Sequence, residues 1–307
     1  MNRRPSQHRG FTLIELLVAI TITSIIIILL LSMTGVVADA WRNGNNKVFT
    51  NAEARAAFNR LTEDLESALI RDTIPNAEWF QARMETASDF TSPPANPTWL
   101  MFFTVPTDRK LFEYKGGTAE YDKDKPVPGN VVAVSYRMRE QDPIKGDKGE
   151  YRMFGLYRAF PKAVNPAEET FRNVLGTEDL AKYWQGKPET EDKDNFYISN
   201  IFDFSFTFWI TIYGSGQGGT SAPKTVPVPP GTQVRVLSEK LIVGATEYPG
   251  GKLAAVEISM TILTQEGAMR LREQETGKDI RAFVANLDNA RTYSHKVYFT
   301  PEARLTY

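Results

Sequence analysis

A long, almost uncharged segment near the start of the chain most restricts what this sequence can fold into. Between Phe11 and Ala38 the only charged residue is Glu15, and the 23 residues from Leu16 to Ala38 carry no formal charge. A helix rises about 1.5 Å per residue, so this run is long enough to cross roughly 30 Å of hydrocarbon. It is too long for an ordinary buried core helix. The sequence therefore predicts a membrane-spanning helix close to the N-terminus.

The segment before this run is a short basic leader that ends in a glycine. Three arginines and no acidic residue precede Gly10, and Glu15 is the fifth residue after it. Basic residues beside a membrane helix favour the cytoplasmic side, which predicts a cytoplasmic N-terminus. A carboxylate within an apolar segment is costly in lipid, so Glu15 is a candidate functional residue. The three arginines are Arg3, Arg4 and Arg9.

The junction of leader and apolar run resembles the processing site of the type IV pilin and type II secretion pseudopilin family. The signature of that family is a Gly-Phe cleavage site with glutamate as the fifth residue of the mature chain, and Gly10, Phe11 and Glu15 fit it without a gap. The resemblance implies that prepilin peptidase cuts between Gly10 and Phe11 and methylates the new amine of Phe11. It also implies that Glu15 faces the N-terminal amine of a neighbouring subunit in a filament.

The same resemblance implies the location and the partners of the chain. We expect a single-pass protein of the cytoplasmic (inner) membrane, with its C-terminal domain on the periplasmic or extracytoplasmic side. The implied partners are other pilin or pseudopilin subunits, prepilin peptidase, the inner-membrane assembly platform and, before assembly, membrane lipid. The resemblance rests on the motif over residues 1–40 and on architecture alone beyond them.

Two other interpretations of the N-terminus compete with this one. A secretory signal peptide also begins basic and continues apolar, and Val36-Val37-Ala38 offers small residues for cleavage, but its apolar region runs only about 7–15 residues. An uncleaved signal anchor explains the length but not Glu15. The second interpretation leaves an alternative function, a signal-anchored extracytoplasmic binding protein that uses the Gly214–Gly231 loop as its contact surface.

The absence of cysteine bears on which kind of subunit this is. Many major type IV pilins carry a C-terminal disulfide loop, so a chain without one is more similar to pseudopilins and minor subunits. The order of helix then sheet, together with the strand around Ala255-Val256-Glu257-Ile258, is similar to J-type minor pseudopilins of type II secretion filaments. A Verru_Chthon cassette C-like paralogue is the other subfamily that the chain resembles.

Beyond the membrane segment the pattern indicates a continuing helix. Apolar residues recur at three- and four-residue steps from Phe58 to Leu69, and acidic residues such as Asp64 are expected on the polar faces. We predict one helix over about 12–72, stopped by Pro75; two helices with a break near Gly44 are the alternative. The predicted divisions are a leader (1–10), a membrane or filament-core helix (11–38), its amphipathic continuation (39–74) and a β-rich extracytoplasmic domain (75–307).

After residue 98 the periodicity changes to two, which is typical of strands. The clearest strand is Phe202–Tyr213, whose apolar face is expected to pack on the long helix so that Phe58, Leu61 and Leu65 face Phe204, Phe206 and Phe208. The fold class is therefore α+β, a pilin-like long helix on an antiparallel sheet. Further strands are predicted at Trp99–Val105, Val132–Met138, Val234–Val243, Leu253–Thr264 and Val297–Thr300. A short helical insertion is predicted at Ala167–Trp184, and irregular surface segments at Tyr114–Pro128, Gly186–Asn195 and Gly214–Gly231.

Catalytic chemistry is poorly provided for, and we expect a structural protein without a cofactor. The chain has no cysteine and two histidines, of which His8 lies in the leader. A Ser-His-Asp triad would therefore rest on His295, which we interpret as an ordinary surface or edge residue. Gly214–Gly219 matches G-x-G-x-x-G, but the prolines that follow prevent the helix that a dinucleotide site needs. These counts disfavour a secreted enzyme.

The net charge of the chain argues against a nucleic-acid partner, and its acidic clusters predict at most a weak calcium site. The formal charge is −1, and removal of the three leader arginines would make it −4, so no nucleic acid is expected as a partner. Loop carboxylates at alternate positions can converge on calcium, but lysines dilute both clusters and a solvated loop is favoured. The weak calcium candidates are Asp122 and Asp124 in one cluster, and Asp192 and Asp194, beside Glu189 and Glu191, in the other.

Overall fold

The structure is a computed structural model, and it divides the chain into two compact units, Met1–Phe49 and Thr50–Tyr307. It describes residues 12–71, 74–84, 98–105, 112–114, 121–126, 131–142, 144–145, 153–160, 177–184, 195–213, 215–216, 219–220, 223–273 and 290–299. Helix α1 (Leu13–Glu66) supplies the described part of the first unit and also begins the second.

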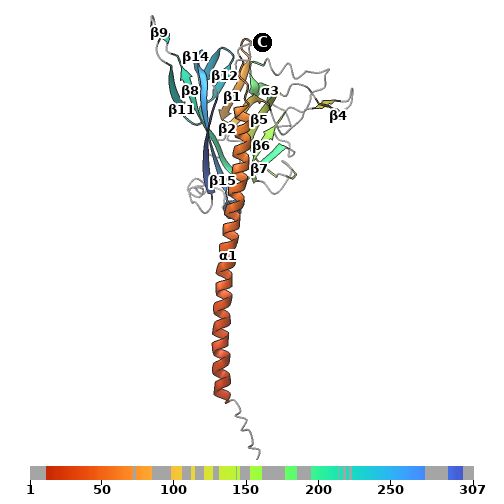
Figure 1. The fold of residues 1–307 in the computed structure, drawn as a ribbon, viewed down its shortest axis with the longest axis vertical. Helices are drawn as coiled ribbons and strands as arrows, with labels where there is room; N and C mark the ends of the chain where they lie inside the picture. Colours follow the sequence, from red (N-terminus) through yellow and green to blue (C-terminus); the bar gives the residue numbers. More distant parts are fainter. Residues whose placement is uncertain are drawn as a thin grey trace, which may run out of the picture. The chain divides into compact units, whose positions relative to one another are not determined.

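Helix α1 is one uninterrupted helix of 54 residues (Figure 1), which confirms the predicted long helix. The alternative of a break near Gly44 is wrong. The helix ends at Glu66, before the predicted end near residue 72 and before Pro75. Beyond Glu66 the Oγ of Ser67 donates to the carbonyl of Glu63 (2.7 Å), and the N–H of Leu69 donates to the carbonyl of Phe103 (2.8 Å). The chain leaves the helix because its backbone bonds to a strand instead.

The described part of the second unit contains two large antiparallel sheets (Figure 1) and two two-stranded ones, which confirms the α+β class. The eight-stranded sheet has the order β14-β13-β12-β1-β2-β5-β6-β7, and the four-stranded sheet has the order β11-β8-β15-β16. The strands of the first are β1 (Glu78–Met84), β2 (Thr98–Thr104), β5 (Val132–Gln141), β6 (Met153–Ala159), β7 (Phe196–Ser199), β12 (Val234–Leu237), β13 (Lys240–Val243) and β14 (Thr246–Pro249). Those of the second are β8 (Ile201–Ile212), β11 (Lys224–Val228), β15 (Lys252–Leu263) and β16 (Ala290–Tyr298).

Smaller elements complete the second unit. Two short hairpins pair β3 (Phe112–Tyr114) with β4 (Tyr121–Pro126), and β9 (Ser215–Gly216) with β10 (Gly219–Thr220). Two short helices follow β6 and β15 in the described chain, α3 (Leu180–Trp184) and α4 (Gln265–Glu273). Helix α3 agrees with the end of the helical insertion predicted at Ala167–Trp184, while residues 167–176 of that prediction lie outside the described residues.

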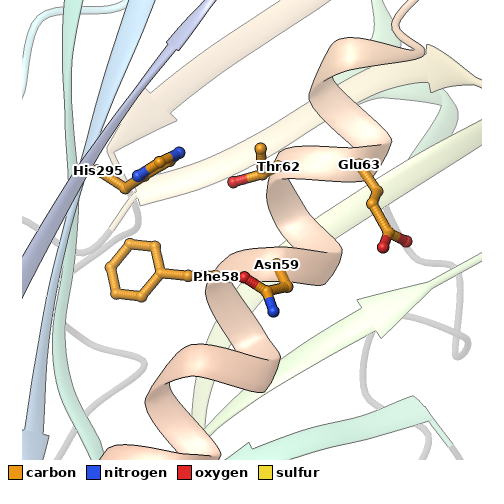
Figure 2. Close-up of a pocket in the computed structure, with 5 residues that line it drawn as sticks. All are labelled: Phe58, Asn59, Thr62, Glu63 and His295. Carbon is orange, nitrogen blue, oxygen red and sulfur yellow. The ribbon is translucent and has the colours of Figure 1, made fainter.

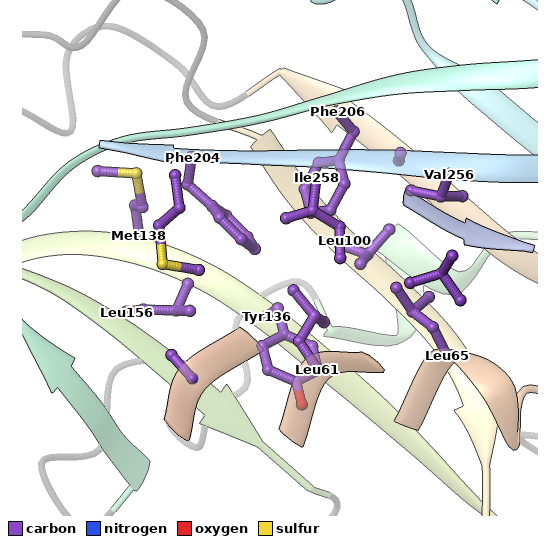
Figure 3. Close-up of a cluster of buried hydrophobic side chains, with 14 of the residues drawn as sticks. Leu61, Leu65, Leu100, Tyr136, Met138, Leu156, Phe204, Phe206, Val256 and Ile258 are labelled. Carbon is purple, nitrogen blue, oxygen red and sulfur yellow. The ribbon is translucent and has the colours of Figure 1, made fainter. Parts of the chain in front are cut away.

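One hydrophobic cluster joins the last turns of α1 to both large sheets (Figure 3). Leu61 and Leu65 of the helix meet Leu100 and Tyr136 from one sheet and Ile258 from the other. All six side chains that were predicted to pack between the helix and β8 are buried in this cluster, while direct contact between the two sets of three stays a prediction. The six side chains are Phe58, Leu61, Leu65, Phe204, Phe206 and Phe208.

A second cluster covers the other face of the eight-stranded sheet. Trp99, Met101 and Phe103 of β2 pack there with Leu180 and Trp184 of α3. Both faces of β2 are therefore buried, which explains why its sequence is an unbroken apolar run with no alternation.

The strand predicted at Val234–Val243 is a hairpin of β12 and β13, so that prediction is wrong. The two halves pair antiparallel, with Val234 opposite Val243. Ser238 leaves the ladder because its Oγ donates to the carbonyl of Ile74 (2.5 Å) and accepts from the Nε1 of Trp79 (3.0 Å). These two contacts replace the glycine or proline that usually marks a turn.

Three other predicted boundaries need correction. The loop predicted at Gly214–Gly231 contains β9, β10 and the edge strand β11, and Pro227 is tolerated in β11 because an edge strand has one side without ladder bonds. The irregular segment predicted at Tyr114–Pro128 contains β4. The last strand begins at Ala290, well before Val297, and includes His295.

Candidate assembly and processing site

Glu15 lies in the first turn of α1 and forms a capping box with Thr12. The backbone N–H and the hydroxyl of Thr12 both donate to Oε2 of Glu15 at 2.9 Å. In return the N–H of Glu15 donates to Oγ1 of Thr12 at 3.4 Å, and the carbonyl of Thr12 accepts the first helical bond from Leu16. These reciprocal bonds satisfy donors that a helix N-terminus otherwise leaves free.

The capping box was missed from sequence, although its signal was present. Threonine followed three residues later by glutamate before an apolar run is the usual pattern of such a cap, and Thr12 and Glu15 have this spacing. Glu15 therefore has a local role in starting the helix in addition to any role in assembly. Its side chain is exposed within the described residues, so the carboxylate is accessible to further donors.

The apolar part of α1 is exposed along its whole length. The large apolar side chains from Leu13 to Phe49 are each at least 49% exposed. Within the described residues, α1 is the helix long and apolar enough to cross a membrane, and the apolar window that meets this criterion has none of its residues buried. A single apolar helix near the N-terminus is consistent with an anchor in the inner membrane.

Residues 5–31 match the family model of the prokaryotic N-terminal methylation motif. The match supports the type IV pilin and pseudopilin family. It spans the leader end, Gly10, Phe11 and the Thr12–Glu15 cap, and it indicates a pilin-like substrate of prepilin peptidase. No curated protein and no solved structure matches the chain. Gly10 and Phe11 lie outside the described residues, so cleavage between them stays a prediction.

The other end of α1 is held by a buried polar cluster around Asp64. Arg158 of β6 donates to both carboxylate oxygens, from Nε and Nη2, each at 2.8 Å. The hydroxyl of Tyr136 donates to Oδ2 at 2.5 Å, and Thr104 donates to the backbone carbonyl of Asp64 at 2.7 Å. The last turn of the helix is thereby bonded to β2, β5 and β6.

Burial dominates the electrostatics of this cluster. It raises the pKa of the Asp64 carboxyl above its ordinary value, while Arg158 and the Tyr136 hydroxyl oppose the rise. Burial and the nearby Asp64 charge also raise the pKa of Tyr136 well above its ordinary value. The expectation that Asp64 lies on a polar face of α1 is wrong, because Asp64 is buried, with 1% of the residue exposed.

A second buried carboxylate, Glu78 of β1, holds α3 in place. Arg235 donates to Oε1 of Glu78 at 2.5 Å, and the N–H of Leu180 donates to Oε2 at 2.6 Å. Burial raises the pKa of Glu78, and the hydrogen bond from Arg235 opposes the rise. The bond from Leu180 to Glu78 attaches α3 to β1, so that Leu180 and Trp184 stay in the second hydrophobic cluster.

His295 lies on β16 beside a shallow pocket of about 230 Å³ (Figure 2). The pocket is also lined by Phe58, Asn59, Thr62 and Glu63 of α1, and the ring of His295 meets that of Phe58 edge-on at 6.4 Å between centroids. None of the five lining residues is a serine or cysteine. The serine of a Ser-His-Asp triad is therefore not among the residues that line this pocket, whose one hydroxyl belongs to Thr62.

The remaining sequence candidates are not assembled into a site by the described residues. Asp122 and Asp124 lie in β4, and Asp192 and Asp194 lie outside the description. Over the ranges given above, no group of three or more His, Cys, Asp or Glu side chains could hold a metal. The G-x-G-x-x-G segment is followed by the strand β11 where a dinucleotide site needs a helix.

Proposed function

We propose that the chain is a structural, non-enzymatic minor pilin or pseudopilin subunit of a type II secretion or type IV pilus-like filament. The observation that carries the proposal is the methylation motif at residues 5–31 at the head of an exposed apolar helix. That helix continues without a break into the core of a β-rich unit. A subunit that resides in the membrane before assembly needs this combination. The same helix must be compatible with lipid before assembly and with packing against neighbouring subunits afterwards.

The proposed mechanism begins with the leader in the cytoplasm, held there by its arginines. Prepilin peptidase cuts between Gly10 and Phe11 and methylates Phe11, which leaves a cationic amine near Glu15. In a filament the Glu15 carboxylate of one subunit pairs with this amine of a neighbour. Bringing the opposite charges together offsets part of the desolvation cost that each pays in an apolar bundle.

The test is N-terminal mass analysis of the full chain made in a host that carries prepilin peptidase. The expected product begins at methylated Phe11. Recovery of an intact chain from Met1 supports the signal-anchored binding protein, and a chain that begins at Asp39 or Trp41 supports a cleaved secretory signal.

Within the family, we propose a J-type minor pseudopilin or a Verru_Chthon cassette C-like paralogue. The helix-then-sheet order and the long β15, which includes Ala255–Ile258, support this assignment. The genes beside this one test it, because pilin-type subunits are usually encoded with their machine. A neighbourhood of type II secretion genes favours the J-type subunit.

A further inference from the structure

We propose that Trp41 and Arg42 bind the headgroup region of the extracytoplasmic leaflet and set the depth of α1 in the bilayer. The inference rests on the membrane residence that forms part of the proposed function. Trp41 is the most exposed tryptophan of the described residues, with 78% of the residue exposed. It lies three residues after Ala38, where the uncharged run ends, and the next residue is a cation.

The length of the helix places this pair at the opposite surface from Glu15. Trp41 follows Glu15 by 26 residues, which corresponds to roughly 39 Å along a helix. The hydrocarbon is about 30 Å thick and the whole bilayer about 40–45 Å with its headgroups. With Glu15 at the cytoplasmic boundary, Trp41 falls in the far headgroup layer, and a modest tilt moves it closer to the acyl chains.

The side chains of Trp41 and Arg42 fit the hydrated headgroup layer of a membrane better than bulk water or a packed helix–helix interface. The indole of Trp41 has an apolar body and one N–H donor, which is why tryptophan gathers at membrane surfaces. The guanidinium of Arg42 recognises phosphate, and its stem can lie along acyl chains. Asp39 and Arg42 flank the indole, and both charges would lose hydration in a packed helix–helix interface.

Phe49 offers an internal comparison on the same helix. It is also exposed, at 61%, but it lies eight residues beyond Trp41, roughly 12 Å further from the bilayer. Phenylalanine has no donor for the interface. The proposal therefore assigns lipid contact to position 41 and not to position 49.

The test uses the fluorescence of the full chain in vesicles of phosphatidylethanolamine and phosphatidylglycerol. The signal of Trp41 is obtained by subtracting the spectrum of Trp41→Phe, which removes the contributions of the other four tryptophans. We expect emission shifted to shorter wavelength than in water, and stronger quenching by lipids brominated near the headgroup than by lipids brominated near the chain end. A matched variant carries Trp41→Phe with Phe49→Trp, and its new indole is expected to emit as in water.

Each other outcome overturns the inference. If Trp41 emits as in water and is not quenched by brominated lipid, it does not contact the bilayer. If lipids brominated near the chain end quench it most strongly, the membrane-spanning segment lies elsewhere on α1. Equal lipid quenching at positions 41 and 49 means that the helix lies along the surface. Protection that grows with the protein-to-lipid ratio assigns Trp41 to a contact with another subunit. Flotation of the same samples separates the two proposals, because a chain that fails to float with vesicles contradicts membrane residence itself.

Discussion

Asp64 in the last turn of α1 and Arg158 in β6 form a buried ion pair between residues 94 positions apart in the chain. Both side chains are at most 3% exposed, and Arg158 reaches both oxygens of the carboxylate. The pair bonds the helix to β6, which lies next to the edge strand β7 of the eight-stranded sheet.

Asp64→Ala is expected to destabilise the β-rich unit strongly. The substitution leaves the Arg158 guanidinium buried without its counter-charge, which costs about 3–5 kcal/mol. The measurement is denaturant unfolding of the full chain in detergent, followed by the fluorescence of the buried tryptophans.

Glu63→Ala is the matched control for this experiment. Glu63 is the preceding residue, but its side chain is 55% exposed, and it pairs with Arg60, which is 15% exposed and whose Nε also lies 3.8 Å from Oδ1 of Asp64. Its loss should change the free energy of unfolding by less than about 1 kcal/mol. Similar losses for the two variants would show that the buried pair adds nothing beyond a surface charge.

Arg158→Met is expected to change how stability depends on pH. Without Arg158, burial raises the pKa of Asp64 further, so the folded state holds a proton that the unfolded state has released. The free energy of unfolding then falls as pH rises from the ordinary aspartate pKa through the raised one. Relative to wild type, the variant should be least stable near neutral pH and recover on acidification. Parallel stability curves for the two proteins over pH 4–8 would contradict this.

The elements with strong local periodicity could be predicted from the sequence. The α1, β8 and β15 patterns give their faces directly, because apolar residues recur at helical or strand spacing. The hairpin of β12 and β13 could not be predicted, because its bend depends on contacts of Ser238 with Ile74 and Trp79. Strand β11 was hidden by Pro227, which is acceptable only at a sheet edge.

In the candidate site, too, local features could be predicted from the sequence and long-range contacts could not. The processing motif and the Thr12–Glu15 cap are local, and both are visible in consecutive residues. The Asp64 cluster is not, because its partners Tyr136 and Arg158 lie 72 and 94 positions away. An acidic residue on an amphipathic helix gives no sign of such partners, so exposure was the natural expectation.

Gly10→Val is expected to block processing of the leader. A glycine has no side chain where the peptidase must approach the backbone, and a branched side chain would obstruct that approach. The measurement is the mass of the chain recovered from a host with prepilin peptidase. Gly35→Val is the control, because a Cβ at Gly35 meets nothing within 4 Å. Normal cleavage of Gly10→Val would remove the role given to this glycine.

Glu15→Gln is expected to be processed and inserted normally but recovered poorly in filaments. Glutamine keeps an acceptor for the Thr12 N–H, so the capping box can persist, but it removes the charge that we propose to face a neighbour's amine. An unpaired amine in an apolar bundle costs several kcal/mol. The measurement is the amount of variant in sheared filaments relative to wild type, with the unfolding of the β-rich unit expected to stay unchanged.

Thr12→Ala separates the charge of Glu15 from its cap. This substitution keeps the carboxylate and removes the hydroxyl that bonds it, at a cost of about 0.5–2 kcal/mol to the first turn of the helix. If pairing with a neighbour's amine is what matters, Thr12→Ala assembles nearly as well as wild type while Glu15→Gln does not. The reverse ranking would assign Glu15 to the helix start alone, because loss of the cap would then explain the defect. Equal assembly of all three proteins would refute charge pairing as a requirement of the filament.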